Sequence, residues 1–259
     1  MWRGRGVREV MVDRVRCNDA GVRIPPGLYT SALDTLFPPR CVARGCGVRG
    51  AWLCRTCIRS VTPVPNACPV CAGVRCACRP RTPWAFHCAC AAGLYQGPLR
   101  DAVRALKFRA IAPLGEPLGT LAANALRKAV SLPPGAAVVP VPGLPARTAA
   151  RGIDHTQLLA RGAARTLGLP MDGSVLVRSG ARGRQVGLSA AARAENLAGA
   201  FRLACPPPPC VVLVDDVFTT GATAQAASSV FRSVGTVVFV AVVARSDRVT
   251  SHVDEPRSR

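Results

Sequence analysis

Residues 211–227, Val-Val-Leu-Val-Asp-Asp-Val-Phe-Thr-Thr-Gly-Ala-Thr-Ala-Gln-Ala-Ala, combine an apolar run, two acids and a Thr/Gly-rich turn. The run from Val211 to Val214 is typical of a central parallel strand that is buried on both faces. We expect this strand to end at Asp215 and Asp216, and a helix to begin after the turn. Free N–H groups, hydroxyls and small side chains at a helix start bind phosphate well. The stretch therefore predicts a phosphate site beside two carboxylates, formed by Thr219, Thr220, Gly221, Ala222 and Thr223.

Other segments of the chain repeat the same alternation of strand and helix. Residues 136–142 and 234–244 are apolar, β-branched runs, and we expect the first to lie beside the strand at 211–214. Residues 99–108 and 114–130 have helical spacing of their apolar positions. This alternation predicts an α/β fold with a central parallel sheet flanked by helices.

Length and hydropathy place limits on the class of protein. A chain of 259 residues can bury a sizeable core, and we expect two domains, one of them small. No apolar run reaches the roughly 18–20 residues needed to cross a bilayer, so membrane insertion is not expected. Residues 1–16 lack the apolar core of a secretion signal, which favours a cytoplasmic protein, and Met1 and Met11 are both candidate start residues.

The charge of the chain is strongly positive. It has 34 Lys and Arg against 14 Asp and Glu, a formal net charge of +20. Such a balance favours polyanionic partners, because each neutralised phosphate releases counterions. A solvated basic surface without a partner is the alternative interpretation.

Cysteines gather near the amino terminus. Of the 13 in the chain, most precede residue 91, and without a secretion signal metal ligation is a better explanation than disulfides. Zinc is the expected metal, and iron–sulfur ligation is the rival. Two pairs spaced by four and two residues predict the first tetrahedral site, Cys41, Cys46, Cys54 and Cys57.

A second zinc site is predicted from less regular spacing. Cys68 and Cys71 form a ligand pair on a Cys-Pro-Val-Cys turn, and we favour Cys76 and Cys78 as its partners. His87, Cys88 and Cys90 remain alternatives. A segment this short cannot bury enough apolar surface to fold alone, so metal binding would supply the missing free energy.

The stretch at 211–227 resembles the phosphoribosyl pyrophosphate (PRPP) motif of the type I phosphoribosyltransferases. The resemblance implies that Asp215 and Asp216 bind the ribose hydroxyls with Mg²⁺ nearby, while residues 219–223 hold the 5′-phosphate. Arg147 and Arg151 follow the strand at 136–142 and are well placed for the pyrophosphate.

The order of several blocks resembles the ComF family of competence proteins: residues 33–41, 94–100, 106–108, 139–142, 185–189 and the PRPP motif. That resemblance implies a double zinc ribbon followed by a type I phosphoribosyltransferase fold, PRPP as ligand, and as partners single-stranded DNA and other competence proteins such as a helicase. The expected organisation is an extension at 1–30, the ribbon at 31–92, the transferase-like domain at 93–246 and a tail at 247–259. The family's flexible lid corresponds to Gln185, Gly187, Leu188 and Ser189.

The reaction itself is left open by the sequence. An active phosphoribosyltransferase of nucleotide salvage or purine metabolism, with no role in DNA handling, is the alternative function. The family usually has Phe-Asn where this chain has Ile153-Asp154-His155, so the contacts of the pyrophosphate-side loop are expected to differ from the family pattern. The lid at 185–189 identifies no catalytic base. His155 is a candidate, although a loop or helix-capping role is favoured.

Overall fold

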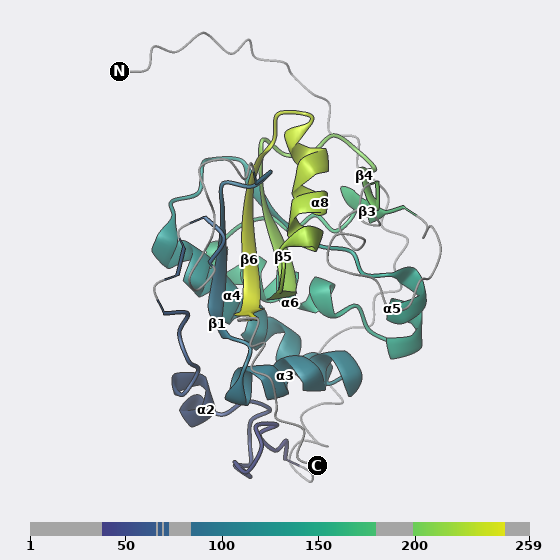
Figure 1. Ribbon diagram of the computed structural model, residues 1–259. Coiled ribbons are helices and arrows are strands. Elements are labelled where there is room, and N and C mark those ends of the chain that lie inside the picture. Colours follow the sequence, from purple (N-terminus) through teal and green to yellow (C-terminus); the bar gives the residue numbers. More distant parts are fainter. Residues whose placement is uncertain (1–37, 66, 69, 73–83, 180–198, 247–259) are drawn as a thin grey trace, which may run out of the picture.

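Four parallel strands form the central sheet in the order β1-β6-β5-β2. In the computed structural model, the residues described are 38–65, 67–68, 70–72, 84–179 and 199–246 (Figure 1). The predicted neighbour of the 211–214 strand is confirmed, because Val138 of β2 pairs with Val212 of β5. The strands are β1 (Cys88–Leu94), β2 (Ala136–Pro140), β5 (Cys210–Phe218) and β6 (Val237–Arg245).

Helices cover both faces of this sheet. Val212 and Val214 of β5 join one apolar core with α3, α4 and α6, whereas Val211 and Leu213 join the core beneath α8. Figure 1 shows α8 on one side of the strands with α4 and α6 on the other. The predicted α/β fold with a flanked parallel sheet is confirmed. The long helices are α3 (Gly97–Phe108), α4 (Gly115–Ala129), α6 (His155–Leu167) and α8 (Ala222–Arg232).

Helices α4 and α6 cross at glycines. A Cβ atom on Gly119 would overlap the carbonyl oxygen of Leu159, and one on Gly162 would overlap that of Glu116. The missing side chains let the two backbones approach closely, which brings the start of α6 toward the sheet. This contact helps to position the residues at the amino end of α6.

Strand β5 is longer than the sequence predicts. Instead of ending at Asp215, it continues to Phe218 and pairs with β6 as far as Arg245. Val217 and Phe218 are good strand formers, and the long β6 offers backbone partners beyond the acids. Both acids therefore lie within a hydrogen-bonded strand.

Two small elements lie outside the central sheet. Helix α5 (Pro145–Arg151) precedes α6 and ends at Gly152, whose φ of 70° suits glycine. An antiparallel hairpin of β3 (Leu176–Arg178) and β4 (Phe201–Leu203) packs its apolar residues into the core beneath α8. A 3-10 turn, Ala112–Leu114, links α3 to α4.

The Cys-rich segment packs against the sheet domain. Its helix α2 (Arg55–Arg59) contacts α3, and the Arg44 N–H donates to the Asp101 side chain at 3.0 Å. The predicted boundary at residue 92 falls inside β1, whose residues 88–91, 93 and 94 pair with β6.

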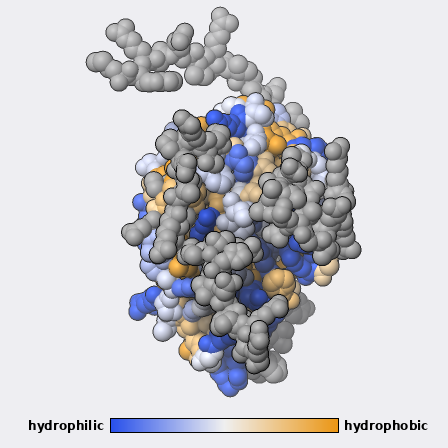
Figure 2. All heavy atoms as spheres, in the orientation of Figure 1, coloured by the Kyte–Doolittle hydropathy of each residue, from blue (hydrophilic) through white to orange (hydrophobic). Residues whose placement is uncertain are grey.

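The surface carries a mixture of residue types. Figure 2 shows hydrophilic and apolar residues interspersed over the described part of the face seen in Figure 1. Within the described residues, no helix has the length and apolar character required to span a membrane.

Candidate functional site

The two acids of β5 have different surroundings at the carboxyl edge of the sheet. Asp216 is buried, with 5% of its surface exposed, and its Oδ2 lies 2.5 Å from Lys107 Nζ and 2.8 Å from His155 Nε2. Lys107 comes from the last turn of α3 and His155 from the first residue of α6. Asp216 is thus held inside the protein by two basic side chains.

Both ring nitrogens of His155 lie within hydrogen-bond distance of another side chain. Its Nδ1 lies 3.4 Å from Arg151 Nη1. Because a guanidinium only donates hydrogen bonds, Nδ1 accepts and Nε2–H donates to Asp216. Asp154 caps α6 by accepting from the backbone N–H groups of Thr156 and Gln157. Residues 153–155 thus form the start of α6, where both ring nitrogens of His155 face side chains that hold it beside Asp216.

The pKa values of the two acids move in opposite directions. Burial, followed by the neighbouring charge of Asp216, raises the pKa of Asp215 to about 7. Burial also opposes ionisation of Asp216, but the hydrogen bond with His155 and the charge of Lys107 lower its pKa below the ordinary value. Asp215 is partly exposed and has no side chain as an ion-pair partner among the described residues. It is therefore the carboxylate available to a ligand.

Arginines face the same edge. Arg147 lies exposed on α5, and Arg151 ends that helix. Arg178, from β3, donates to the carbonyl oxygen of Pro142 at 3.4 Å. Burial and then the charge of Arg147 lower the pKa of Arg178, while the charge of Asp215 opposes this shift. The positive charges near Asp215 favour an anionic ligand.

The 219–223 loop joins β5 to α8 at this edge. Thr219 and Thr220 are exposed, and Gly221, with φ of 82°, is the N-cap of α8. Glycine has no side chain to cap the first turn, and that turn contains no acidic residue. The helix start therefore presents N–H groups and positive dipole to an anion.

Aromatic rings pack against this loop at Gly221. A Cβ atom on Gly221 would lie 2.5 Å from Cζ of Phe218 and 3.0 Å from the Trp84 ring. Trp84 stacks on Phe86 with 5.0 Å between the ring centres. The Arg245 guanidinium lies 4.5 Å from the centre of the Phe218 ring. Only glycine fits the loop at position 221.

The structure brings together most of the predicted PRPP-site residues and adds two. Asp215, Asp216, Arg151 and the 219–223 loop surround the carboxyl edge of β5, whereas the predicted lid at 185–189 lies outside the described residues. Sequence reasoning missed Arg178, and it gave no role to Lys107, although Lys107 is one of only two lysines in the chain.

Four cysteines form the candidate metal centre. The Sγ atoms of Cys41, Cys46, Cys54 and Cys57 all lie within 4.8 Å of one another. Four thiolates around zinc at about 2.3 Å require S···S separations of about 3.8 Å, so the donor set and its spacing fit tetrahedral zinc. The Cys57 backbone N–H lowers the pKa of the Cys54 thiol to about 7. The residues of the predicted first site are thus gathered in one place.

The second predicted zinc site is only partly visible. Cys76 and Cys78 lie outside the described residues. Cys68 and Cys71 form a turn closed by a 2.9 Å bond from the Ala72 N–H to the Cys68 carbonyl oxygen. The alternative ligands Cys88 and Cys90 belong to β1, and among the described residues neither joins a cluster of three or more ligands. The second site stays a prediction.

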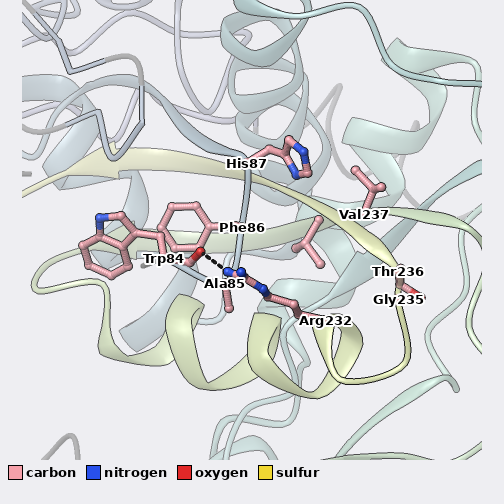
Figure 3. A pocket seen from close by; sticks show the side chains of 9 residues that line it. Trp84, Ala85, Phe86, His87, Arg232, Gly235, Thr236 and Val237 are labelled. Atoms are coloured by element: carbon pink, nitrogen blue, oxygen red, sulfur yellow. Dashed lines mark hydrogen bonds between the residues drawn. The ribbon is translucent and has the colours of Figure 1, made fainter. Parts of the chain in front are cut away.

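A separate hollow of about 420 Å³ opens at the amino ends of β1 and β6 (Figure 3). There Arg232 donates to the carbonyl oxygen of Trp84 at 2.8 Å, and the His87 side chain points away from Arg232. Because this hollow adjoins the opposite edge of the sheet from Asp215, it is not the candidate PRPP site.

Sequence comparison finds relatives that are named for DNA utilization or for competence. The chain is 33% identical over 184 residues to the DNA utilization protein YhgH of Salmonella typhi, an alignment covering 66% of this chain and 80% of the relative. It is 31% identical to the DNA utilization protein YhgH of Escherichia coli K12, in an alignment that covers 67% of this chain and 82% of the relative. It is 34% identical to competence protein F of Haemophilus influenzae, in an alignment that covers 55% of this chain and 66% of the relative.

Two solved structures are similar over about half of the chain. One is the allosteric regulatory enzyme of purine biosynthesis, with 22% identity and a TM-score of 0.33 over 49% of this chain and 25% of that one. The other is adenine phosphoribosyltransferase of Leishmania tarentolae, with 17% identity and a TM-score of 0.29 over 52% and 56%. No protein-family model matches the chain.

Proposed function

Because the chain belongs to the ComF family, we propose that it binds PRPP with Mg²⁺ at the carboxyl edge of its sheet and takes part in handling single-stranded DNA in the cytoplasm during natural competence. One observation carries the PRPP assignment: the 219–223 loop, Asp215 and the arginines of α5 and β3 meet at one edge. Their chemistry matches the three parts of PRPP, which are a phosphate, a ribose and a pyrophosphate.

Each part of the ligand has a matching group. The N–H groups and hydroxyls of the 219–223 loop would bind the 5′-phosphate, and Asp215 would accept hydrogen bonds from the ribose hydroxyls. Arg147 and Arg178 would neutralise the pyrophosphate, with Arg151 behind them. Mg²⁺ bound with PRPP would reduce the negative charge of the pyrophosphate, and carboxylate oxygens suit this ion. Asp216 would act through its ion pairs with Lys107 and His155 by holding this part of β5 against α3 and α6.

Calorimetric titration of PRPP with Mg²⁺ tests the assignment. The wild-type chain should bind, and Asp215→Ala/Asp216→Ala should lose binding, because the acceptor for the ribose hydroxyls and the carboxylate that is paired with Lys107 and His155 are both removed. Circular dichroism of the double variant checks that the fold persists. Asp172→Ala is a control, because this partly exposed carboxylate caps the turn before β3. Equal affinity of the wild type and the double variant would refute the pocket.

The pH dependence of affinity tests the role of Asp215 separately. Its pKa of about 7 means that the carboxyl is protonated at pH 6 and ionised at pH 8. If PRPP binds the ionised form, affinity should rise about tenfold between these pH values and level off above them. Asp215→Asn should abolish this rise while keeping any contribution from titration of PRPP itself. The same pH dependence in both proteins would contradict the assignment of Asp215.

A further inference from the structure

One large aromatic side chain is exposed beside the candidate site. Phe108, at the end of α3, has 68% of its surface exposed. The guanidinium carbons of Arg104 and Arg151 lie 5.7 Å and 6.0 Å from the centre of its ring. The ring makes cation–π contacts with both arginines, and most of its surface stays accessible to a further flat partner.

The ring ends a row of basic side chains along α3. Arg100, Arg104 and Phe108 are spaced by four residues and so share one face of the helix. Near the start of α3, Arg44 of the Cys-rich segment reaches Asp101, which also lies 3.7 Å from Arg100. We call Arg44, Arg100, Arg104 and Phe108 the α3 stripe.

The α3 stripe has a net positive charge. Asp101 is the only acid that the described residues place in ion-pair contact with it, and that carboxylate is shared by two arginines. The Arg44 side chain is 82% exposed and that of Arg100 is 42% exposed. The guanidiniums are therefore accessible to an anion in solution.

The stripe also links two parts of the molecule. Arg44 belongs to the loop that carries Cys41 and Cys46. At the other end, Phe108 directly follows Lys107, which forms an ion pair with Asp216. A chain-like polyanion lying along α3 would therefore run from the Cys₄ centre to the mouth of the PRPP site.

The chemistry of the stripe selects among polyanions. Arginines contact phosphates of any nucleic acid, but a flat exposed ring can stack only on a base that is not already paired. In a duplex both faces of each internal base are covered by neighbouring bases. A peptide of acidic residues would bind the arginines and leave the ring without a partner.

We propose that the α3 stripe binds single-stranded DNA, with a base stacked on Phe108 and neighbouring phosphates contacting Arg104 and the arginines toward the Cys₄ centre. This inference rests on the DNA-handling part of the proposed function. Its test is separate from PRPP binding, because Arg44, Arg100 and Arg104 contact neither Asp215 nor the 219–223 loop, although the Phe108 ring lies 6.0 Å from the Arg151 guanidinium.

Fluorescence anisotropy of the full chain with a labelled thymidine oligonucleotide of about 20 nucleotides tests the stripe. Phe108→Ala should weaken binding about tenfold without changing the salt dependence, because stacking involves no counterions. Arg104→Ala should weaken binding and reduce the slope of log K against log salt concentration by about 0.7, the value for one phosphate contact on a single strand.

Two variants at the opposite edge of the sheet serve as controls. Val234→Ala removes an exposed apolar side chain, and Arg127→Ala removes an exposed charge at the end of α4. Neither should weaken binding. Unchanged affinity of Phe108→Ala, or the same loss in Val234→Ala, would overturn the proposal. Tighter binding of the matching duplex or of a uridine oligoribonucleotide would overturn the choice of single-stranded DNA.

Measuring PRPP binding and oligonucleotide binding on the same proteins distinguishes failure of the stripe from failure of the proposed function. Arg104→Ala should bind PRPP with wild-type affinity. If the wild type binds PRPP but no oligonucleotide, both the DNA-handling part of the function and the stripe are wrong. If the wild type binds the oligonucleotide and Phe108→Ala binds it equally well, only the stripe is wrong.

Discussion

Lys107→Met should lower the free energy of unfolding by about 3 kcal/mol, because it leaves the buried Asp216 carboxylate with one basic partner instead of two. Methionine has a similar length, so the main change is loss of charge. The expected fall in melting temperature is about 6–12 °C for a chain of this size. Thermal and urea unfolding followed by circular dichroism measure both quantities.

The chain offers a closely matched control. Lys128→Met changes the only other lysine, which is exposed in the last turn of α4, and should alter stability by less than about 0.5 kcal/mol. Lys107→Met/Asp216→Asn should recover part of the loss, since the unpaired charge is gone. Similar losses for the two lysine variants, or no recovery in the double variant, would contradict the ion-pair account.

Cys57→Ser should remove one zinc ion per chain and unfold the Cys-rich segment. A structural zinc ion with four thiolates supplies about 10–16 kcal/mol of binding free energy, more than so small a segment gains from its apolar contacts. The Cys₄ residues lie in the same apolar cluster as α3, so loss of the metal should also loosen the Arg44–Asp101 contact. Zinc analysis and thermal unfolding with and without a chelator measure these effects.

A cysteine outside the cluster tests the specificity of that result. Cys205→Ser changes a partly buried thiol beyond β4 and should retain the wild-type zinc content. Full zinc content in Cys57→Ser, or equal losses in both variants, would show that the metal is bound elsewhere. Iron in place of zinc would favour the iron–sulfur alternative.

Local patterns in the sequence were enough to predict the sheet and the Cys₄ centre. The apolar runs at 136–142 and 211–214 are strands whose burial on both faces leaves no alternating polar residues. The cysteine spacing predicted four ligands because such spacing is determined by short loops around the metal. In both cases neighbouring residues along the chain carry the information.

The parts that were not predicted depend on contacts between distant residues. Lys107 and Asp216 meet although more than a hundred positions separate them, and no periodicity signals such a pair. Arg178 reaches the site from a short hairpin that has little strand pattern of its own. The extension of β5 past Asp215 depends on the length of β6, which supplies its hydrogen-bond partners. Each of these features is a property of the tertiary structure.

His155 illustrates the difference between residue type and role. From sequence it was a candidate base or a capping residue, since histidine serves in both roles. In the structure Asp154 provides the cap, and the two nitrogens of His155 face Arg151 and Asp216. A positioning role could be assigned only after both neighbours were located.

Hydrogen–deuterium exchange of the full chain with PRPP and Mg²⁺ most directly tests the central claim, because it shows where the ligand binds. PRPP should slow exchange of the backbone N–H groups in the 219–223 loop and the first turn of α8, and should not do so in Asp215→Ala/Asp216→Ala. Protection confined to the Cys-rich segment, or binding by calorimetry with no protection of the loop, would contradict the PRPP site.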